Sequence, residues 1–310
     1  MTWLALVVLA LVLLWPAPLL LARARWPHRE PRAALVLWQA FGLAGGLALV
    51  GAALAIALAP LREGLFGGLH TVLTRGMAGL SWAHAGLLAV ALGLGAWLTG
   101  VLAHRFVRTV LTQRRHRELL DLVAEPWPVK DGGPGSGTRE GFGGDPAHGR
   151  VLSHPQAVAY CVPGADPRVV LSSGALDLLD EAELFAVVAH ERAHLAERHD
   201  LVVLAFTAWT AALPGLPGAR KARSAVTTLI EMLADDRACM VCDRAALATA
   251  LARVGSAGAP AGALAAGGGA TVARVHRLLE PPAPSPLIRL AAYSGAALLL
   301  AVPTLALLLT

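Results

Sequence analysis

The chain has 310 residues, of which 56% are hydrophobic and 15% are charged, and its mean hydropathy is +0.59. This composition is too apolar for an ordinary soluble domain and indicates a membrane protein. The formal net charge is +5. Its arginines have neither interleaved aromatic residues nor a binding motif beside them, which argues against direct nucleic-acid binding.

Four segments are apolar and long enough to cross a bilayer, which takes about 20 helical residues. They are roughly Trp3–Ala22, Ala33–Pro60, Trp82–Leu102 and Leu287–Leu309. The first is similar to a signal peptide, but its apolar run is too long and no basic residue precedes it. A fifth apolar run, Leu201–Leu213, is too short to span, so we expect a buried helix or one that lies against the bilayer surface.

Basic residues flank the predicted spans unequally. Arginines crowd the connection after the first span and the segment after the third, whereas the connection Leu61–Ser81 contains only Arg62 and Arg75. By the positive-inside rule, the two arginine-rich segments are cytoplasmic. We therefore expect a multi-pass plasma-membrane protein with both termini outside, whose basic segments also attract anionic lipids of the bilayer.

The spans predict three parts. Residues 1–103 form a three-span membrane domain, residues 104–286 a cytoplasmic domain, and residues 287–310 a fourth transmembrane helix. Two stretches rich in Gly, Pro or Ala, near 131–149 and 255–269, are predicted to be mobile loops. The three cysteines all fall in the predicted cytoplasmic part and are too few for a disulfide framework.

Residues 190–194 read His-Glu-Arg-Ala-His within a predicted helix. Histidines four residues apart share one helical face, so His190 and His194 can bind the same metal ion. Glu191, beside the first histidine, is placed to take a proton from water. This is the arrangement of a zinc peptidase, with two ligands and a general base.

A second acidic pair follows at Glu231 and Asp235. A catalytic zinc site needs three protein ligands, and Glu231 can supply the third. Asp235, one helical turn later, can accept the free ring N–H of a ligand histidine. The alternative is that both carboxylates are the solvated edge of a helix. Occurring together with the histidine motif, they favour a site for one Zn²⁺ ion.

The segment before the histidine motif contains a predicted strand and a helix start. Residues 168–171 are predicted to form a strand, followed by a turn at 172–174; the strand is either an edge that pairs with an extended substrate or an ordinary core strand. Asp180 and Glu183 have the spacing of a capping box.

Three other pairs of residues leave alternatives open. Cys239 and Cys242 fit a buried helical face better than a redox or second metal site. His199 and Asp200 are explained by a surface or helix end, or they help to orient the site. Arg274 and His276 are the candidates for an additional catalytic donor that stabilises the oxyanion.

Together these features resemble the BlaR/MecR-type membrane metallopeptidases. The resemblance rests on His190-Glu191-x-x-His194, on Glu231-x-x-Ala234-Asp235, and on three spans before the site and one after it. The lead-in at Val162-Pro163-Gly164 and 169–174 is similar too. The resemblance implies a mainly α membrane protein with four transmembrane helices and a cytoplasmic α+β, gluzincin-like zinc-peptidase domain between the third and fourth.

The resemblance also implies a function. His190, His194 and Glu231 would bind zinc, Glu191 would activate water, and the substrate would be a cytoplasmic winged-helix repressor. Unlike the antibiotic-sensing members, this chain has no extracellular penicillin-binding domain after the last span, so a separate sensor protein is one expectation. The alternatives are a Ste24/HtpX-like quality-control protease and a non-catalytic membrane receptor or scaffold.

Overall fold

The computed structural model describes residues 2–127, 149–257 and 264–308. The chain divides into two compact units. The first unit comprises residues 1–105, 203–229 and 284–310, and the second comprises 106–202 and 230–283. Residues 203–229 group with the apolar helices of the first unit. Almost all of the predicted loop near 131–149 lies outside the described residues, as do residues 258–263 of the predicted loop near 255–269. Residues 255–257 and 264–269 are helical, so the prediction of a loop is wrong there.

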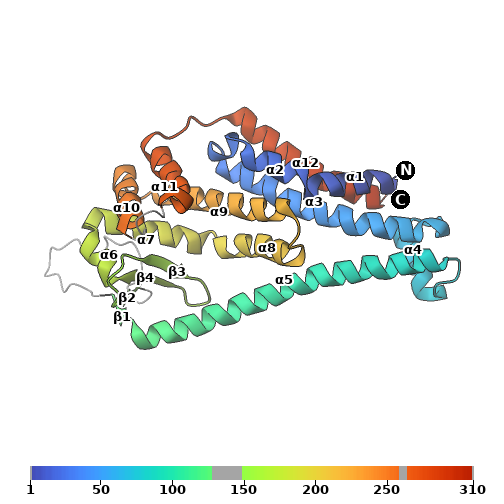
Figure 1. Cartoon of the computed structure of the whole chain (residues 1–310), viewed down its shortest axis with the longest axis horizontal. Helices are drawn as coiled ribbons and strands as arrows, with labels where there is room; N and C mark the ends of the chain where they lie inside the picture. The colour runs from blue at the N-terminus through green and yellow to red at the C-terminus, as the bar shows by residue number, and fades with distance from the viewer. Residues whose placement is uncertain (1, 128–148, 258–263, 309–310) are drawn as a thin grey trace. The chain divides into compact units, whose positions relative to one another are not determined.

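The first unit contains the apolar helices (Figure 1). Four candidate spans are long and apolar enough to cross a membrane among the described residues, as the composition predicts. The helices are α1 (Thr2–Leu14), α2 (Pro16–Arg23), α3 (Pro31–Leu58), α4 (Gly64–Arg75), the first part of α5 (Trp82–Val123) and α12 (Pro286–Leu308).

Two of these helices differ from the predicted spans. The first predicted span is divided at Trp15, because Pro16 lacks the N–H that a continuous helix would need there. α5 does not end at Leu102 but runs for 42 residues, so the arginine-rich segment belongs to the same helix as the apolar one.

Small residues allow α1, α3 and α12 to pack closely. Ala48 and Ala52 of α3 are buried against Leu6 and Ala10 of α1. At the start of α3, the buried Glu30 accepts hydrogen bonds from the Ser285 amide, 2.7 Å away, and from Arg289 Nε, 3.1 Å away. This contact connects the beginnings of α3 and α12.

The chain from the histidine motif at 190–194 to the Glu231–Asp235 pair forms a helical hairpin, made by α8 (His199–Ala212) and α9 (Pro217–Ala238). Its tip belongs to the first unit. The ring of Trp209 lies against Gly46 of α3, where an added Cβ would be 3.2 Å away. Trp97 of α5 donates to the Ala212 carbonyl at 3.3 Å. The apolar run Leu201–Leu213 is therefore a short helix packed beside the apolar helices.

The second unit contains a four-stranded sheet of order β1-β2-β4-β3. Its strands are β1 (Glu125–Pro126), β2 (Gly149–Leu152), β3 (Ala159–Val162) and β4 (Arg168–Ser172). β4 is parallel to β2 and antiparallel to β3. The predicted strand at 168–171 is thus real, but it is paired on both sides. A substrate cannot add to it, and the core-strand alternative is the correct one.

The predicted turn at 172–174 is wrong. Ser172 ends β4, and its side chain accepts from the Ala175 amide to cap α6 (Ser173–Leu178). The capping box of α7 (Glu181–Ala196) is present, with Glu183 N to Asp180 Oδ1 at 2.9 Å and Asp180 N to Glu183 Oε2 at 3.0 Å.

α7 is fixed in place by its apolar face and by two later helices. Val187 and Val188 pack against Leu171 of β4, and Ala186 packs in a second buried cluster with Leu247 and Leu278. Leu247 belongs to α10 (Arg244–Ala257), and Leu278 belongs to α11 (Leu264–Leu279). α7 is thus held on two sides, and its polar residues are presented on the remaining face.

Candidate metal centre

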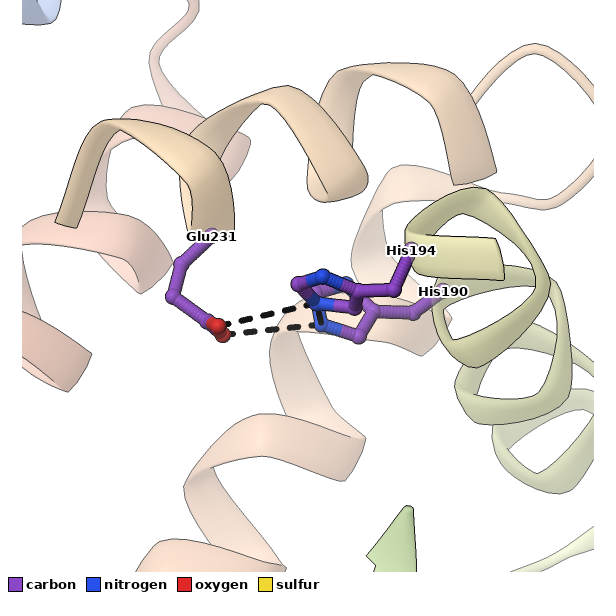
Figure 2. Close-up of side chains that lie close together, drawn as sticks. All are labelled: His190, His194 and Glu231. Carbon is purple, nitrogen blue, oxygen red and sulfur yellow. Dashed lines mark hydrogen bonds and ion pairs between the residues drawn. The ribbon is translucent and has the colours of Figure 1, made fainter. Parts of the chain in front are cut away.

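Three side chains from two helices meet at one point (Figure 2). His190 and His194 extend from α7 and Glu231 extends from α9, and one ligand atom from each lies within 4.8 Å of the others. The two Nε2 atoms are 3.1 Å apart. Glu231 Oε2 is 3.6 Å from His190 Nε2, and Oε1 is 3.5 Å from His194 Nε2.

These separations fit zinc. Zinc bonds of about 2.0–2.1 Å in a tetrahedron place neighbouring ligand atoms about 3.3–3.4 Å apart. Two imidazole nitrogens and one carboxylate are also a common catalytic donor set for this ion. Two ring nitrogens that face each other at 3.1 Å need a cation or a proton between them, because their lone pairs otherwise repel. The residues therefore fit a single Zn²⁺ ion.

The carboxylate of Asp235 lies beside Nδ1 of His190, the ring nitrogen that faces away from the other two candidate ligands. Its Oδ1 lies 2.9 Å from His190 Nδ1, although the N–H direction falls outside hydrogen-bond geometry. Asp235 is almost fully buried. Burial lowers the pKa of His190, but the neighbouring Asp235 and Glu231 carboxylates outweigh it and raise that pKa to about 9. The structure thus brings Asp235 next to His190, but without the hydrogen bond that the sequence predicts.

His199 supports the second histidine, a role that the sequence left as one of two alternatives. Its Nδ1 is 3.0 Å from His194 Nδ1, and its Nε2 is 3.5 Å from Glu197 Oε2. For His194 Nε2 to bind a metal, Nδ1 must carry the proton and donate it to His199. Between α7 and α8, Arg198 adopts a left-handed conformation with φ of 50°.

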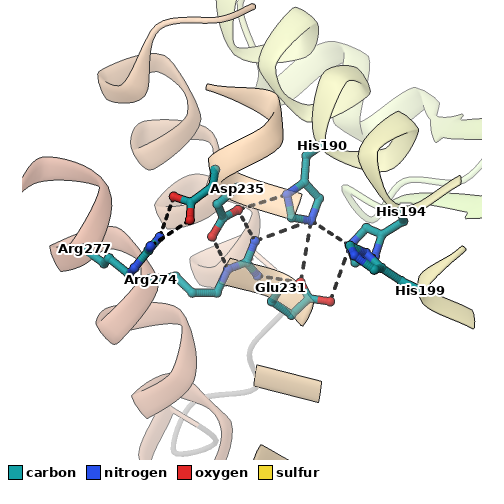
Figure 3. Close-up of polar contacts among 8 residues, drawn as sticks. His190, His194, His199, Glu231, Asp235, Arg274 and Arg277 are labelled. Atoms are coloured by element: carbon teal, nitrogen blue, oxygen red, sulfur yellow. Dashed lines mark hydrogen bonds and ion pairs between the residues drawn. The ribbon is translucent and has the colours of Figure 1, made fainter. Parts of the chain in front are cut away.

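Arg274 of α11 connects the two acidic residues of α9 (Figure 3). Its Nε and Nη2 donate to the two carboxylate oxygens of Asp235, each at 2.7 Å, and its Nη1 donates to Glu231 Oε2 at 2.8 Å. This fork holds both carboxylates in place. It lowers the pKa of Asp235 against the effect of burial, and the pKa of Glu231 is lowered by His190 and by Arg274 together. Because these donors are engaged, Arg274 is a positioning residue here.

Glu191 lies beside the ligands and next to the sheet edge. Burial raises its pKa, and His190 and the Cys161 thiol of β3 oppose that rise. Burial also raises the pKa of Cys161, and the nearby Glu191 charge adds to the effect. Cys161 was not identified from the sequence as a neighbour of the site, because only the packing of β3 against α7 brings it there.

Two other sequence candidates lie outside this group. The His276 side chain is 69% exposed, and its Nε2 lies 3.4 Å from Oε2 of Glu280, just after the end of α11, so the structure does not bring it to the ligands. Its catalytic role stays a prediction from the sequence alone. Cys239 and Cys242 pack against the buried cluster around Ala186 and Leu247, as the core interpretation expects.

Residues 141–251 match the profile of peptidase family M48. The matched segment includes His190, Glu191, His194 and Glu231, and it covers a little over a third of the chain. This part of the chain is thus similar to a metallopeptidase domain, in a family that is typically zinc-dependent. The match supports the prediction of a zinc metallopeptidase domain, but it does not support the prediction of the BlaR/MecR subtype. No curated protein and no solved structure matches the chain significantly.

Proposed function

We propose that this protein is a membrane-embedded, zinc-dependent endopeptidase that hydrolyses peptide bonds of a protein substrate. The observation that carries the proposal is the convergence of His190, His194 and Glu231 on one point, with Glu191 next to the first ligand. The family match over the same residues supports it independently. A non-catalytic receptor or scaffold would need neither the complete ligand set nor Glu191.

The chemistry follows from the side chains present. A zinc ion held by the three ligands would act as a Lewis acid toward the peptide carbonyl and favour water as a nucleophile at neutral pH. Glu191 takes a proton from the attacking water as the C–O bond forms. It then delivers that proton to the leaving nitrogen as the C–N bond breaks. Asp235, His199 and Arg274 hold the ligands in position throughout.

An extended substrate can pair with β3. Among the described residues β3 is at the edge of the sheet, and its Cys161 reaches Glu191. A peptide that adds a strand there places its backbone alongside the metal helix. This assignment replaces the sequence-based one, which placed the substrate on residues 169–171.

The substrate class has two candidates. Cleavage of a cytoplasmic winged-helix repressor, with a separate sensor protein, is supported by the resemblance to BlaR/MecR-type peptidases and by the predicted cytoplasmic placement of the domain. Quality control of membrane proteins is supported by a structural observation: residues 203–229, between the two motifs, group with the apolar helices. A substrate that is itself in the bilayer is consistent with that grouping.

The metal assignment is tested on the purified protein in detergent. We expect close to one zinc per chain, loss of most of it in His194→Ala, and full retention in Glu191→Gln with proteolysis of a casein substrate abolished. The reason is that Glu191 is a base and not a ligand. Equal loss of zinc in both variants would contradict the assignment.

The substrate class is tested by comparing the proteomes of cells that carry the wild type or Glu191→Gln. A single DNA-binding protein that accumulates in the variant supports regulated cleavage. A broad rise of misfolded membrane proteins, with no regulator changed, supports quality control and rejects the repressor proposal.

A further inference from the structure

A groove separates α8 from α9 within the first compact unit. It has a volume of about 600 Å³. Its lining includes two arginines and four hydroxyl side chains: Arg220, Arg223, Ser224, Thr210, Thr227 and Thr228. We name it the α8–α9 groove. No carboxylate lines it, and neither arginine pairs with an acidic residue among those the structure describes. The groove is therefore cationic.

The hydrogen-bonding state of the lining defines the ligand. Thr210, Thr227 and Thr228 donate to helix carbonyls at 2.8, 3.0 and 3.2 Å, so their oxygens remain available as acceptors. Arg220 Nη1 donates to the Pro214 carbonyl at 2.9 Å, which fixes the side chain and leaves its other donors available. A phosphate can accept from the arginine donors, and hydroxyl groups beside it can donate to the threonine oxygens. A ligand that carries both groups therefore matches the lining.

The surroundings of the groove favour a lipid over a soluble phosphate compound. The α8 side of the groove is next to apolar helices: Trp209, which precedes the lining residue Thr210, packs on Gly46 of α3, and Trp97 of α5 donates to the Ala212 carbonyl. Basic pockets among transmembrane helices bind anionic headgroups. The acyl chains of such a lipid would find the apolar helices of the same unit.

We propose that the α8–α9 groove binds the headgroup of an anionic glycerophospholipid, with Arg220 and Arg223 on its phosphate. The groove residues share α9 with Glu231, which follows Thr228 by three positions. A bound headgroup would thus restrain the helix that carries the third metal ligand. The binding itself does not depend on catalysis.

Native mass spectrometry of the full-length protein in detergent tests the proposal, with phosphatidylglycerol as the probe. We expect the wild type to bind it more tightly than phosphatidylcholine, and Arg220→Gln/Arg223→Gln to lose about tenfold to thirtyfold in affinity. Arg237→Gln/Arg244→Gln, two exposed positions in the second unit, is the control with the same change of charge and should stay within about twofold. Retained zinc and a monodisperse peak show that each variant is folded.

Three results would overturn the proposal: an unchanged affinity in the groove variant, an equal loss in the control, or displacement of the lipid by millimolar inorganic phosphate. The last would identify a site for soluble phosphate. If the double variant fails to fold, Arg223→Gln alone decides the question. Within the part of the chain that the structure describes, the Arg223 side chain makes no hydrogen bond that the variant would lose. Its affinity should fall several-fold.

Discussion

The two ligand histidines are supported by partners of different charge. His190 faces the carboxylate of Asp235, whereas His194 faces the neutral ring of His199. A carboxylate increases the basicity of the ligand that it contacts, and a neutral acceptor only fixes the tautomer and the ring orientation. In the proposed zinc site His190 would thus be the stronger of the two ligands, and the binding strength of His194 would depend on His199, which is not itself a ligand.

We predict that His199→Ala weakens zinc binding by about tenfold to a hundredfold, the usual cost of losing such a partner. The physical reason is that His194 Nδ1 would lose its acceptor and the ring its orientation. The measurement is competition with a zinc chelator. His276→Ala is the matched control, since that side chain is exposed, and it should change affinity by no more than about twofold. If His276→Ala instead weakened zinc binding more than His199→Ala, His276 would be part of the metal site.

Two arginines of α11 each donate two hydrogen bonds to one carboxylate, a contact that we call a fork, and the two forks can be compared. Arg274 forks onto Asp235, and Arg277 forks onto Asp236 with both distances at 2.7 Å, away from the ligands. A lysine cannot make either bidentate contact. We predict that Arg274→Lys lowers proteolytic activity about tenfold to a hundredfold, whereas Arg277→Lys leaves it within about twofold.

The measurement is the rate of peptide hydrolysis at saturating zinc, together with thermal unfolding of each variant. Arg274 is a positioning residue for the metal ligands if its variant loses activity beyond its change in stability. Similar losses of activity in the two lysine variants would show that both forks only stabilise the fold.

Residue roles that depend on spacing within one helix were predictable from the sequence. The histidine pair, Glu191 and the Glu231–Asp235 pair all follow from helical periodicity. The contact of His199 was not predictable, because it depends on the left-handed backbone at Arg198, which is not a glycine. Arg274 could not be assigned either, since its partner Asp235 lies 39 positions earlier in the chain.

At the scale of the elements, helix packing in the first unit depends on small residues. An added Cβ at Gly51 of α3 would lie 2.7 Å from Leu307 of α12, which is closer than side chains approach one another. In a bilayer, helices gain little from the hydrophobic effect, so close backbone approach is a main source of their association. The sequence predicted the spans, but not which of their faces would meet or that Pro16 would divide the first.

We predict that Gly51→Leu destabilises the protein by about 1–3 kcal/mol, because the side chain must displace Leu307 or separate the helices. Gly93→Leu on α5 is the control, since nothing lies within 4 Å of a Cβ added there. Thermal unfolding in detergent, followed by circular dichroism, measures both. Equal stability of the two variants would show that α3 and α12 are not closely packed.

At the scale of the whole molecule, three helices belong to both compact units. α5, α8 and α9 each begin or end among the apolar helices and continue into the unit with the metal ligands. α9 carries the groove arginines in one unit and Glu231 in the other. The boundary between the two units therefore falls within continuous helices at these three places. The apolar runs did not predict this sharing, because hydropathy marks only the apolar part of each helix.

The last prediction concerns the side of the membrane on which the site lies. The arginines of α5 follow its apolar part directly, whereas α4 carries only one, so the positive-inside rule places α5 beyond residue 105 in the cytoplasm. In spheroplasts treated with a membrane-impermeant maleimide, Thr74→Cys on α4 should be labelled. Thr112→Cys on α5 should be labelled only after permeabilisation. The wild type, with its three native cysteines, sets the background. Labelling of Thr112→Cys in intact spheroplasts would place the metal centre outside the cell and eliminate a cytoplasmic repressor as the substrate.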